Sequence, residues 1–391
     1  MRPLDDEVLA GVDDDETLDL LQRLVRTPSG NPPGGEARVA ELLADFLRTR
    51  GFEPRLHEIE AGRANLTAVF DTGSPGPTLM LNGHLDTMPA GPGWTTDPLG
   101  GVVRDGHVFG LGAADQKSGL AAMAVAATAV RRAGLPLRGR LLLAGVVDEE
   151  GAGLGARRLV EQGLHADCAV ITEPTELGLV RVSNGQVNLE LLVRGKSAHG
   201  SSPESGRNAI EAAARVILAL GEQARRLRAR IHPLIGPTTL NVGTIQGGLV
   251  TSIVPAECRL TIDRRVIPGD SVDGAIADLD ELLHQLRAQD PTLDVERRVM
   301  MAVPPVEVPE ELPLCRIMRE TTARILGRDL GYTGLRGSTD AATFQSAGIP
   351  TLIFGPGSLS KAAHRADESV PLVELHAATR ILTLSVARFL A

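Results

Sequence analysis

Aromatic residues and cysteines are scarce in this 391-residue chain, and each scarcity excludes certain kinds of core or site. One tryptophan, one tyrosine and seven phenylalanines leave the core to aliphatic side chains. The three cysteines lie far apart in apolar surroundings, without paired spacing, so neither a disulfide framework nor a cysteine-ligated zinc site is expected. We therefore expect buried free thiols and a cytoplasmic location.

Basic runs and long apolar runs are also missing. The formal net charge is −9 and acids and bases are interspersed, so neither a nucleic acid nor a membrane is expected as a partner. The N-terminal stretch is acidic and lacks the apolar centre of a signal peptide. The apolar stretch 119–130 is too short to span a membrane. The length suits two domains rather than one.

Apolar strands alternate with amphipathic helices up to about residue 179. This pattern predicts an α/β domain whose mixed, mostly parallel sheet is covered by helices on both faces. The expected helices are 15–27, 35–51, 116–134 and 154–163, and the expected strands are 65–70, 77–86, 139–150 and 167–174.

The pattern changes near residue 180. A strand, a helix, two strands, a helix and a strand are expected at 186–197, 206–230, 238–248, 256–269, 271–289 and 292–301. This order predicts an α+β ferredoxin-like domain. The helix–strand alternation then resumes, with a buried strand at 349–357 and a closing helix at 371–391. We expect a catalytic domain over 1–179 and 301–391, with the ferredoxin-like domain inserted over 180–300.

Three apolar segments end in side chains that can bind a metal. These side chains are His84 and Asp86, then Asp148, Glu149 and Glu150, and finally Glu173. Binding sites in open α/β sheets lie at the carboxyl ends of the strands, so we expect all of them on one rim. Asp115, just before a helix, and His364, just after a strand, are placed to join that rim.

Each residue also has an ordinary structural interpretation. His84 suits a hydrogen-bonded core histidine, Asp115 a helix N-cap, and the acids at 148–150 a solvated loop. Glu173 suits a strand end and His364 a loop. A shared metal site explains their common placement with a single cause.

The charges are consistent with a metal site. Three carboxylates carry −3 against +4 for two divalent ions, which leaves room for one bridging hydroxide. Nitrogen and oxygen ligands without thiolate suit zinc, with cobalt or manganese as alternatives. Asp86 is placed to orient the His84 imidazole, and Glu149 is left over as a base.

Five short motifs give the chain a resemblance to a known family. "HLDT", "GAADQKSGLAAM", "DEEG", "TEP" and "AHRADE", in this order, resemble the dinuclear metallohydrolases that include acetylornithine deacetylase, succinyl-diaminopimelate desuccinylase and the aminoacylases. The resemblance covers nearly the whole chain. It implies one zinc on His84, Asp115 and Glu173, and another on Asp115, Glu150 and His364. It also implies a cis peptide after the bridging Asp115, and Glu149 as the general base.

The resemblance extends to the inserted domain, which it identifies as a lid and dimerisation domain. His199 matches a histidine that reaches the partner subunit's active site and steadies the oxyanion, which implies a homodimer. Arg265, with Asn241 nearby, matches the residues that hold the substrate carboxylate. The "GSTDA" segment matches a loop beside the site and supplies two further candidate substrate-binding residues, Gly337 and Ser338. Leu111 and Ser252 depart from the common pattern, which leaves substrate identity open.

These observations predict a metal-dependent amidohydrolase that acts on an N-acyl amino acid or a small peptide-like amide. "FGPGSL", before His364, favours the acetylornithine deacetylase branch. A metallo-carboxypeptidase or dipeptidase on the same scaffold is the alternative. From other classes, a nucleotide-binding oxidoreductase would use "GLGAAD" as its dinucleotide loop, and a non-catalytic binding protein would have kept only the fold.

Overall fold

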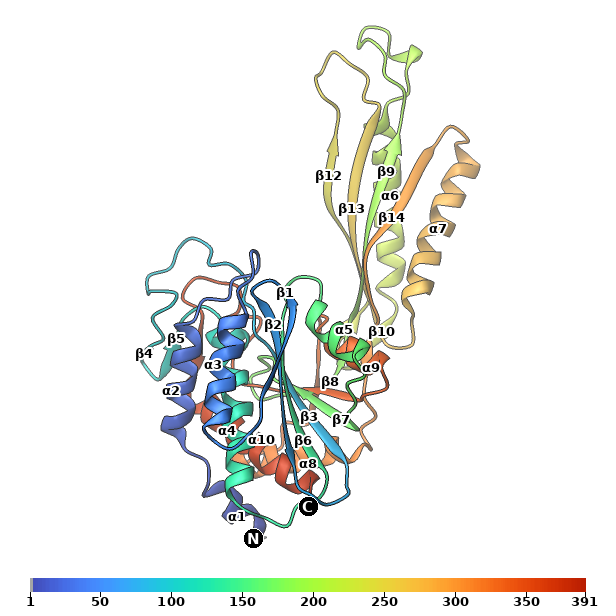
Figure 1. The fold of residues 1–391 in the computed structure, drawn as a ribbon. Helices are drawn as coiled ribbons and strands as arrows, with labels where there is room; N and C mark the ends of the chain where they lie inside the picture. Colours follow the sequence, from blue (N-terminus) through green and yellow to red (C-terminus); the bar gives the residue numbers. More distant parts are fainter. Residues whose placement is uncertain (1–2) are drawn as a thin grey trace. The chain divides into compact units, whose positions relative to one another are not determined.

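A computed structural model describes residues 3–391, which fold into two compact units (Figure 1). Unit 1 contains the chain up to Arg181 together with Val308–Thr333 and Thr339–Ala391. Unit 2 contains Val182–Glu307 and the short segment Gly334–Ser338. Gly337 and Ser338 therefore belong to the smaller unit.

Unit 1 is built on a mixed sheet with the strand order β1-β2-β6-β3-β7-β17-β8. These strands are β1 (Arg55–Glu60), β2 (Arg63–Asp71), β6 (Arg140–Val146), β3 (Thr78–His84), β7 (Cys168–Ile171), β17 (Thr351–Ile353) and β8 (Leu179–Ser183). The central pairs β6–β3, β3–β7 and β7–β17 are parallel. Strands β3 and β6 are buried along nearly their whole length because aliphatic side chains fill both faces.

Helices flank this sheet. They are α1 (Pro3–Leu9), α2 (Asp14–Val25), α3 (Ala37–Arg48), α4 (Ser118–Arg132), α5 (Leu154–Glu161), α8 (Pro313–Leu326), α9 (Ala341–Ser346) and α10 (Leu372–Phe389). Figure 1 shows α3, α4 and α10 on one side of the sheet and α5 and α9 on the other. The predicted α/β architecture is thus confirmed. A small sheet of β4 (Val102–Arg104), β5 (His107–Phe109) and β18 (Ser369–Pro371) was not predicted.

Unit 2 is an antiparallel sheet with the order β12-β13-β9-β14 and two helices. Its elements are β9 (Gly185–Arg194), α6 (Ala209–Leu227), β12 (Thr239–Gly247), β13 (Glu257–Val266), α7 (Val272–Gln289) and β14 (Asp294–Val303). Alternate residues of β9 and β13 are buried beneath α6 and α7. The chain order and the alternation confirm the ferredoxin-like prediction.

The remaining elements are short. They are β10 (Ile231–His232), β11 (Gly236–Pro237), β15 (Val306–Glu307), β16 (Tyr332–Leu335), a π-helical turn at Ala113–Lys117 and a 3-10 turn at Pro203–Ser205. Across residues 3–391, no helix combines the length and apolarity that a membrane crossing requires.

Candidate metal centre

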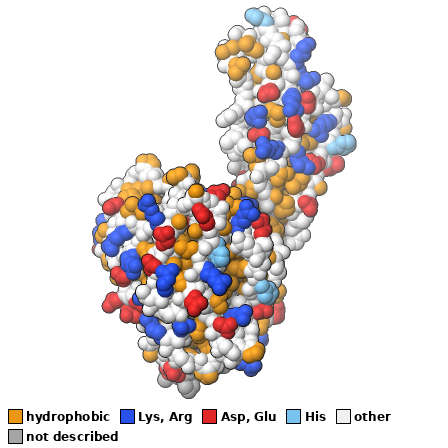
Figure 2. Space-filling view, viewed as in Figure 1, with side chains coloured by type: hydrophobic (Ala, Val, Ile, Leu, Met, Phe, Trp, Pro, Cys, Tyr) orange, Lys and Arg blue, Asp and Glu red, His pale blue; other side chains and the backbone are white. Residues whose placement is uncertain are grey.

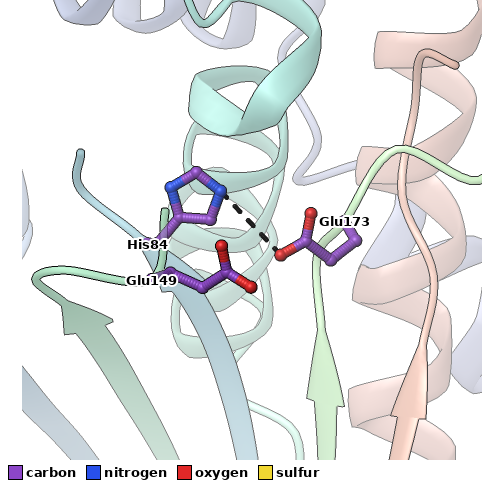
Figure 3. A group of neighbouring side chains, drawn as sticks. All are labelled: His84, Glu149 and Glu173. Atoms are coloured by element: carbon purple, nitrogen blue, oxygen red, sulfur yellow. Dashed lines mark ion pairs between the residues drawn. The ribbon is translucent and has the colours of Figure 1, made fainter. Parts of the chain in front are cut away.

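His84 ends strand β3 and is almost completely buried. Its Nδ1 lies 2.9 Å from the backbone carbonyl of Asp86, which fixes the proton on this nitrogen. Its Nε2 lies 3.1 Å from Oδ1 of Asp115. The same nitrogen lies 3.9 Å from Oε1 of Glu173, the ion pair drawn in Figure 3. Nδ1 is therefore used by the backbone, and Nε2 is the nitrogen that could bind a metal. Nε2 points at two carboxylates.

Asp115 lies between two histidines. Its Oδ1 is near His84, and its Oδ2 lies 3.4 Å from Nε2 of His364. Its backbone is non-helical, and the Asp115–Gln116 peptide is cis, as the resemblance implied. Lys117, not Asp115, occupies the N-cap position of α4, so the N-cap interpretation of Asp115 is wrong.

Glu150 and His364 form the opposite side of the cluster. Oε1 of Glu150 lies 2.9 Å from Nε2 of His364, whose side chain is half exposed. His364 therefore contacts both Glu150 and Asp115, and Asp115 also faces His84. The distances therefore place Asp115 between two groups of nitrogen and oxygen donors.

Glu149 and Glu173 are carboxylates with altered acidity. Burial, followed by the charges of neighbouring carboxylates, raises the pKa of Glu173 well above its ordinary value. Burial also raises the pKa of Glu149, although the nearby His84 opposes the change. Figure 3 shows both side chains converging with His84 from the ends of separate segments.

The two histidines respond to the same crowding. Burial tends to lower the pKa of His84, but Asp115 and Glu173 raise it overall. Hydrogen bonds to Asp115 and Glu150 raise the pKa of His364 to about 10. The negative charges of the carboxylates thus favour the protonated, positively charged form of both rings. A bound metal ion would supply this compensating positive charge in place of the protons.

The donor set fits divalent metal ions. Ligand atoms of His84, Glu149 and Glu173 lie within 4.8 Å of one another, and so do those of His84, Asp115 and Glu150. All are imidazole nitrogens or carboxylate oxygens, which suit zinc, cobalt or manganese. A solvated loop at 148–150 is excluded because Asp148 is buried and the Glu150 side chain is only 8% exposed.

Asp86 holds the backbone of the segment that carries Glu149 and Glu150. Its side chain is fully buried, and its two carboxylate oxygens accept hydrogen bonds from the backbone N–H groups of Glu149 and Glu150, each at 3.2 Å. Asp86 contacts His84 mainly through its backbone carbonyl, since its Oδ1 is 3.7 Å from the ring nitrogen.

Five other predicted site residues lie in unit 2. They are His199, Asn241, Arg265, Gly337 and Ser338. Nδ1 of His199 lies 2.7 Å from the hydroxyl of Ser201. Arg265 forms an ion pair with Asp263 on the same strand, and Ser338 donates to the side chain of Gln186.

Two residues that hold the cluster were not assigned from the sequence. The carboxylate of Glu368 accepts hydrogen bonds from the backbone N–H groups of Gly112, Ala114 and Asp115. The amide of Gln116 donates to Glu173 at 2.6 Å. Glu368 ends the "AHRADE" motif, yet no spacing rule links it to a loop more than 250 residues earlier.

Glu368 also bears on the "GLGAAD" segment. The backbone N–H groups that a dinucleotide phosphate would need there are donated to this carboxylate. This arrangement opposes the nucleotide-binding alternative.

Histidines and carboxylates gathered at the carboxyl ends of sheet strands form a donor set of the kind that metal-dependent hydrolases use. Residues 80–388 match the model of peptidase family M20/M25/M40. The chain therefore belongs to this family of dinuclear metallohydrolases.

Individual relatives agree with this assignment. The chain is 30% identical over 389 residues to an acetylornithine deacetylase of Proteus mirabilis, covering 95% of this chain and 96% of that protein. A crystal structure of a tripeptidase from Staphylococcus aureus is similar with a TM-score of 0.80 and 25% identity, covering 96% of this chain and 99% of that one. A dinuclear metal-binding peptidase from Bacillus subtilis shares the fold, with a TM-score of 0.75, 14% identity and coverage of 96% and 98%.

Proposed function

We propose that this protein hydrolyses the amide bond of an N-acyl amino acid, as an acetylornithine deacetylase-like deacylase. The observation that carries the proposal is Asp115 lying between His84 and His364, with Glu149 beside His84 and Glu173. This arrangement suits two metal ions with one acid left over as a base. The deacetylase relative, which matches over nearly the full length, supports the choice of substrate class.

Two divalent ions would occupy the cluster. His84, Asp115 and Glu173 would hold one, and Asp115, Glu150 and His364 the other. Zinc is the proposed metal, and cobalt or manganese is the alternative. When bound, such ions polarise an amide carbonyl and lower the pKa of water towards about 7.

Glu149 is the proposed general base. Its carboxylate takes a proton from the attacking water as the new C–O bond forms. The same proton then passes to the departing amine nitrogen as the C–N bond breaks. Asp86 orients the base and His84 through the hydrogen bonds described above.

Unit 2 is proposed to bind the substrate. Arg265 would hold the substrate carboxylate with its planar guanidinium, together with Asn241 and the segment that contains Gly337 and Ser338. Asp263 already pairs with Arg265, so this arginine is held in place before the substrate arrives.

We further propose a homodimer through unit 2, in which His199 steadies the oxyanion in the partner's site. Support comes from an apolar group on the surface of unit 2. Leu249, Val250 and Ile253 are 91%, 57% and 41% exposed. In Figure 2, hydrophobic side chains gather towards the end of unit 2 that is uppermost in the view. Exposed apolar patches of this kind mark association surfaces.

A cytoplasmic location is proposed as well. All three cysteines are free and buried, which suits a reducing compartment.

A panel of substrates tests the reaction class. N-acetyl and N-succinyl amino acids are compared with dipeptides and tripeptides by the release of free amine. We expect kcat/KM for the best acyl amino acid to exceed that for any peptide by at least about tenfold, since an acyl pocket has no partner for a peptide's charged N-terminus. A faster peptide would favour the metallo-carboxypeptidase or dipeptidase alternative, which the tripeptidase-like structure also supports.

A further inference from the structure

We propose that Asn31 and Arg63 are positioning residues that fix the loop carrying Glu149 and Glu150. The inference rests on the proposed role of Glu149 as the base. Neither residue belongs to the cluster of metal-binding donors. Each acts through an intermediate carboxylate, Asp86 or Asp148, that holds the loop.

Asp86 is the first intermediate. Its two oxygens accept from the backbone N–H groups of Glu149 and Glu150, so its carboxylate determines where both side chains begin. A displacement of this carboxylate would move the proposed base and a proposed metal ligand together. Small displacements of this kind cost reaction rate.

Asn31 connects Asp86 to the second intermediate. Its side-chain amide nitrogen donates to Oδ2 of Asp86 at 3.0 Å and to Oδ1 of Asp148 at 2.9 Å. Without this donor, the buried carboxylates of Asp86 and Asp148 would each lose a hydrogen bond that stabilises their negative charge. The Asn31 backbone is itself fixed, because its N–H donates to the carbonyl of Thr87 at 2.8 Å.

Asp148 is the second intermediate, directly before the base. Its φ of 68° is left-handed, a conformation that costs free energy for a residue with a Cβ. Its Oδ2 accepts from the backbone N–H of Ala152 at 3.1 Å, which closes the loop around Glu149 and Glu150. The surroundings must hold Asp148 in this conformation.

Arg63 on strand β2 supplies that constraint. Its guanidinium binds Glu36 through Nε at 3.0 Å and Nη2 at 2.6 Å, and Nη2 also donates to Oδ1 of Asp148 at 2.9 Å. The Arg63 side chain is only 12% exposed, and that of Glu36 is fully buried. The ion pair with Glu36 orients the arginine, and the arginine then holds Asp148.

Two glycines leave the space that this network needs. A Cβ on Gly151 would lie 2.6 Å from Oδ1 of Asp148, and a Cβ on Gly34 would lie 2.9 Å from Nε of Arg63. Both neighbours are held by hydrogen bonds and cannot move aside freely. Gly151→Ala therefore offers a way to displace Asp148 without removing any charge.

Kinetics of three variants, Asn31→Ala, Arg63→Met and Gly151→Ala, test the proposal. We expect kcat for an N-acetyl amino acid to fall by about 10- to 100-fold in each variant. This is the loss typical of mutating residues that orient active-site groups without contacting the substrate. KM should stay within about twofold, and the metal content measured with metal in excess should be unchanged. The kcat of Arg63→Lys should lie between those of Arg63→Met and the native protein, because lysine keeps the positive charge but lacks the planar guanidinium.

The matched control is Arg140→Met. Arg140 on β6 pairs with Asp71 on the neighbouring strand β2 at 2.8 Å, and both side chains are about half exposed. Its kcat should equal that of the native protein. A purely structural role for Arg63 would lower the midpoint of unfolding but leave kcat per folded, metal-loaded molecule unchanged, and this result would overturn the inference.

Hydrogen exchange separates this inference from the proposed function. The backbone amides of Glu149 and Glu150 should exchange at least about tenfold faster in Asn31→Ala than in the native protein. Faster exchange supports the positioning role even if the native protein hydrolyses no acyl amino acid, in which case only the proposed function fails. Unchanged exchange and unchanged kcat, in a native enzyme that is active, would refute the positioning role alone.

Discussion

Nε2 of His364 lies 2.9 Å from Oε1 of Glu150, although 214 residues separate them in the chain. His364 follows strand β17 and Glu150 follows β6, two strands that lie in the same sheet. The candidate metal-binding cluster is therefore assembled by strand order rather than by local sequence. This is why short motifs spread over most of the chain can form one site.

Asp115 is the residue whose loss should empty both metal positions. Asp115→Asn removes the charge that faces both His84 and His364. We expect metal affinity to fall by more than the 10- to 100-fold typical of residues that only orient ligands. Elemental analysis after dialysis measures the loss. Asp71→Asn, a surface change on β2, is the control and should keep its full metal content.

Most of the cluster could be predicted from the sequence because each ligand follows an apolar strand or precedes a helix. The ends of the apolar runs located the candidate residues, and the rule that parallel strands share a carboxyl rim brought them together. Glu368, Asn31 and Arg63 could not be predicted in this way. Their partners are backbone N–H groups and carboxylates that only the folded chain brings within reach.

The small sheet of β4, β5 and β18 shows a second limit of sequence patterns. Each strand has only three residues, too few to display a periodicity. The ferredoxin-like unit was easier to predict, since β9 and β13 alternate over ten residues each.

Complementation tests whether His199 acts across a dimer. Glu149→Gln and His199→Ala are each expected to be nearly inactive alone. If His199 serves the partner's site, half of a random mixture is heterodimer, and each heterodimer has one intact site, so about a quarter of native activity returns. Coexpression followed by activity measurement provides the test. No recovery in confirmed heterodimers would show that His199 acts within its own chain, and an active His199→Ala protein would show that His199 has no role.

Glu16 makes stability depend on pH. Burial tends to raise its pKa, but hydrogen bonds from Arg132 and Arg50 lower it overall from the ordinary 4.5. A lowered carboxyl pKa stabilises the folded state above the unfolded-state pKa, and this contribution is lost as pH falls through the folded-state value.

The comparison with Glu16→Gln measures this contribution. At pH 6 the free energy of unfolding should be about 1 kcal/mol lower in the variant. The difference should shrink progressively below pH 4.5. Glu58→Gln, an exposed position on β1, is the control. A Glu16 difference that persists unchanged to pH 3 would contradict this explanation.

Gly119, near the start of α4, should not tolerate a side chain. A Cβ there would overlap the carbonyl oxygen of Thr172, next to the proposed ligand Glu173. Gly119→Ala should lower the free energy of unfolding by about 1–3 kcal/mol. Gly221→Ala, in open space on α6, should instead raise it by about 0.5–1 kcal/mol. Denaturant unfolding measures both changes, and equal effects at the two positions would contradict the packing described here.

Metal content measured together with chelator-sensitive hydrolysis is the decisive test of the proposed metal-dependent reaction. The purified protein is subjected to elemental analysis, and its hydrolysis of N-acetyl amino acids is followed before and after chelation and after zinc or cobalt is restored. We expect about two divalent ions per chain, loss of activity on chelation, and recovery when metal is returned. A protein that binds no metal, and stays inactive when zinc or cobalt is added, would show that the buried acids are structural and that the proposed function is wrong.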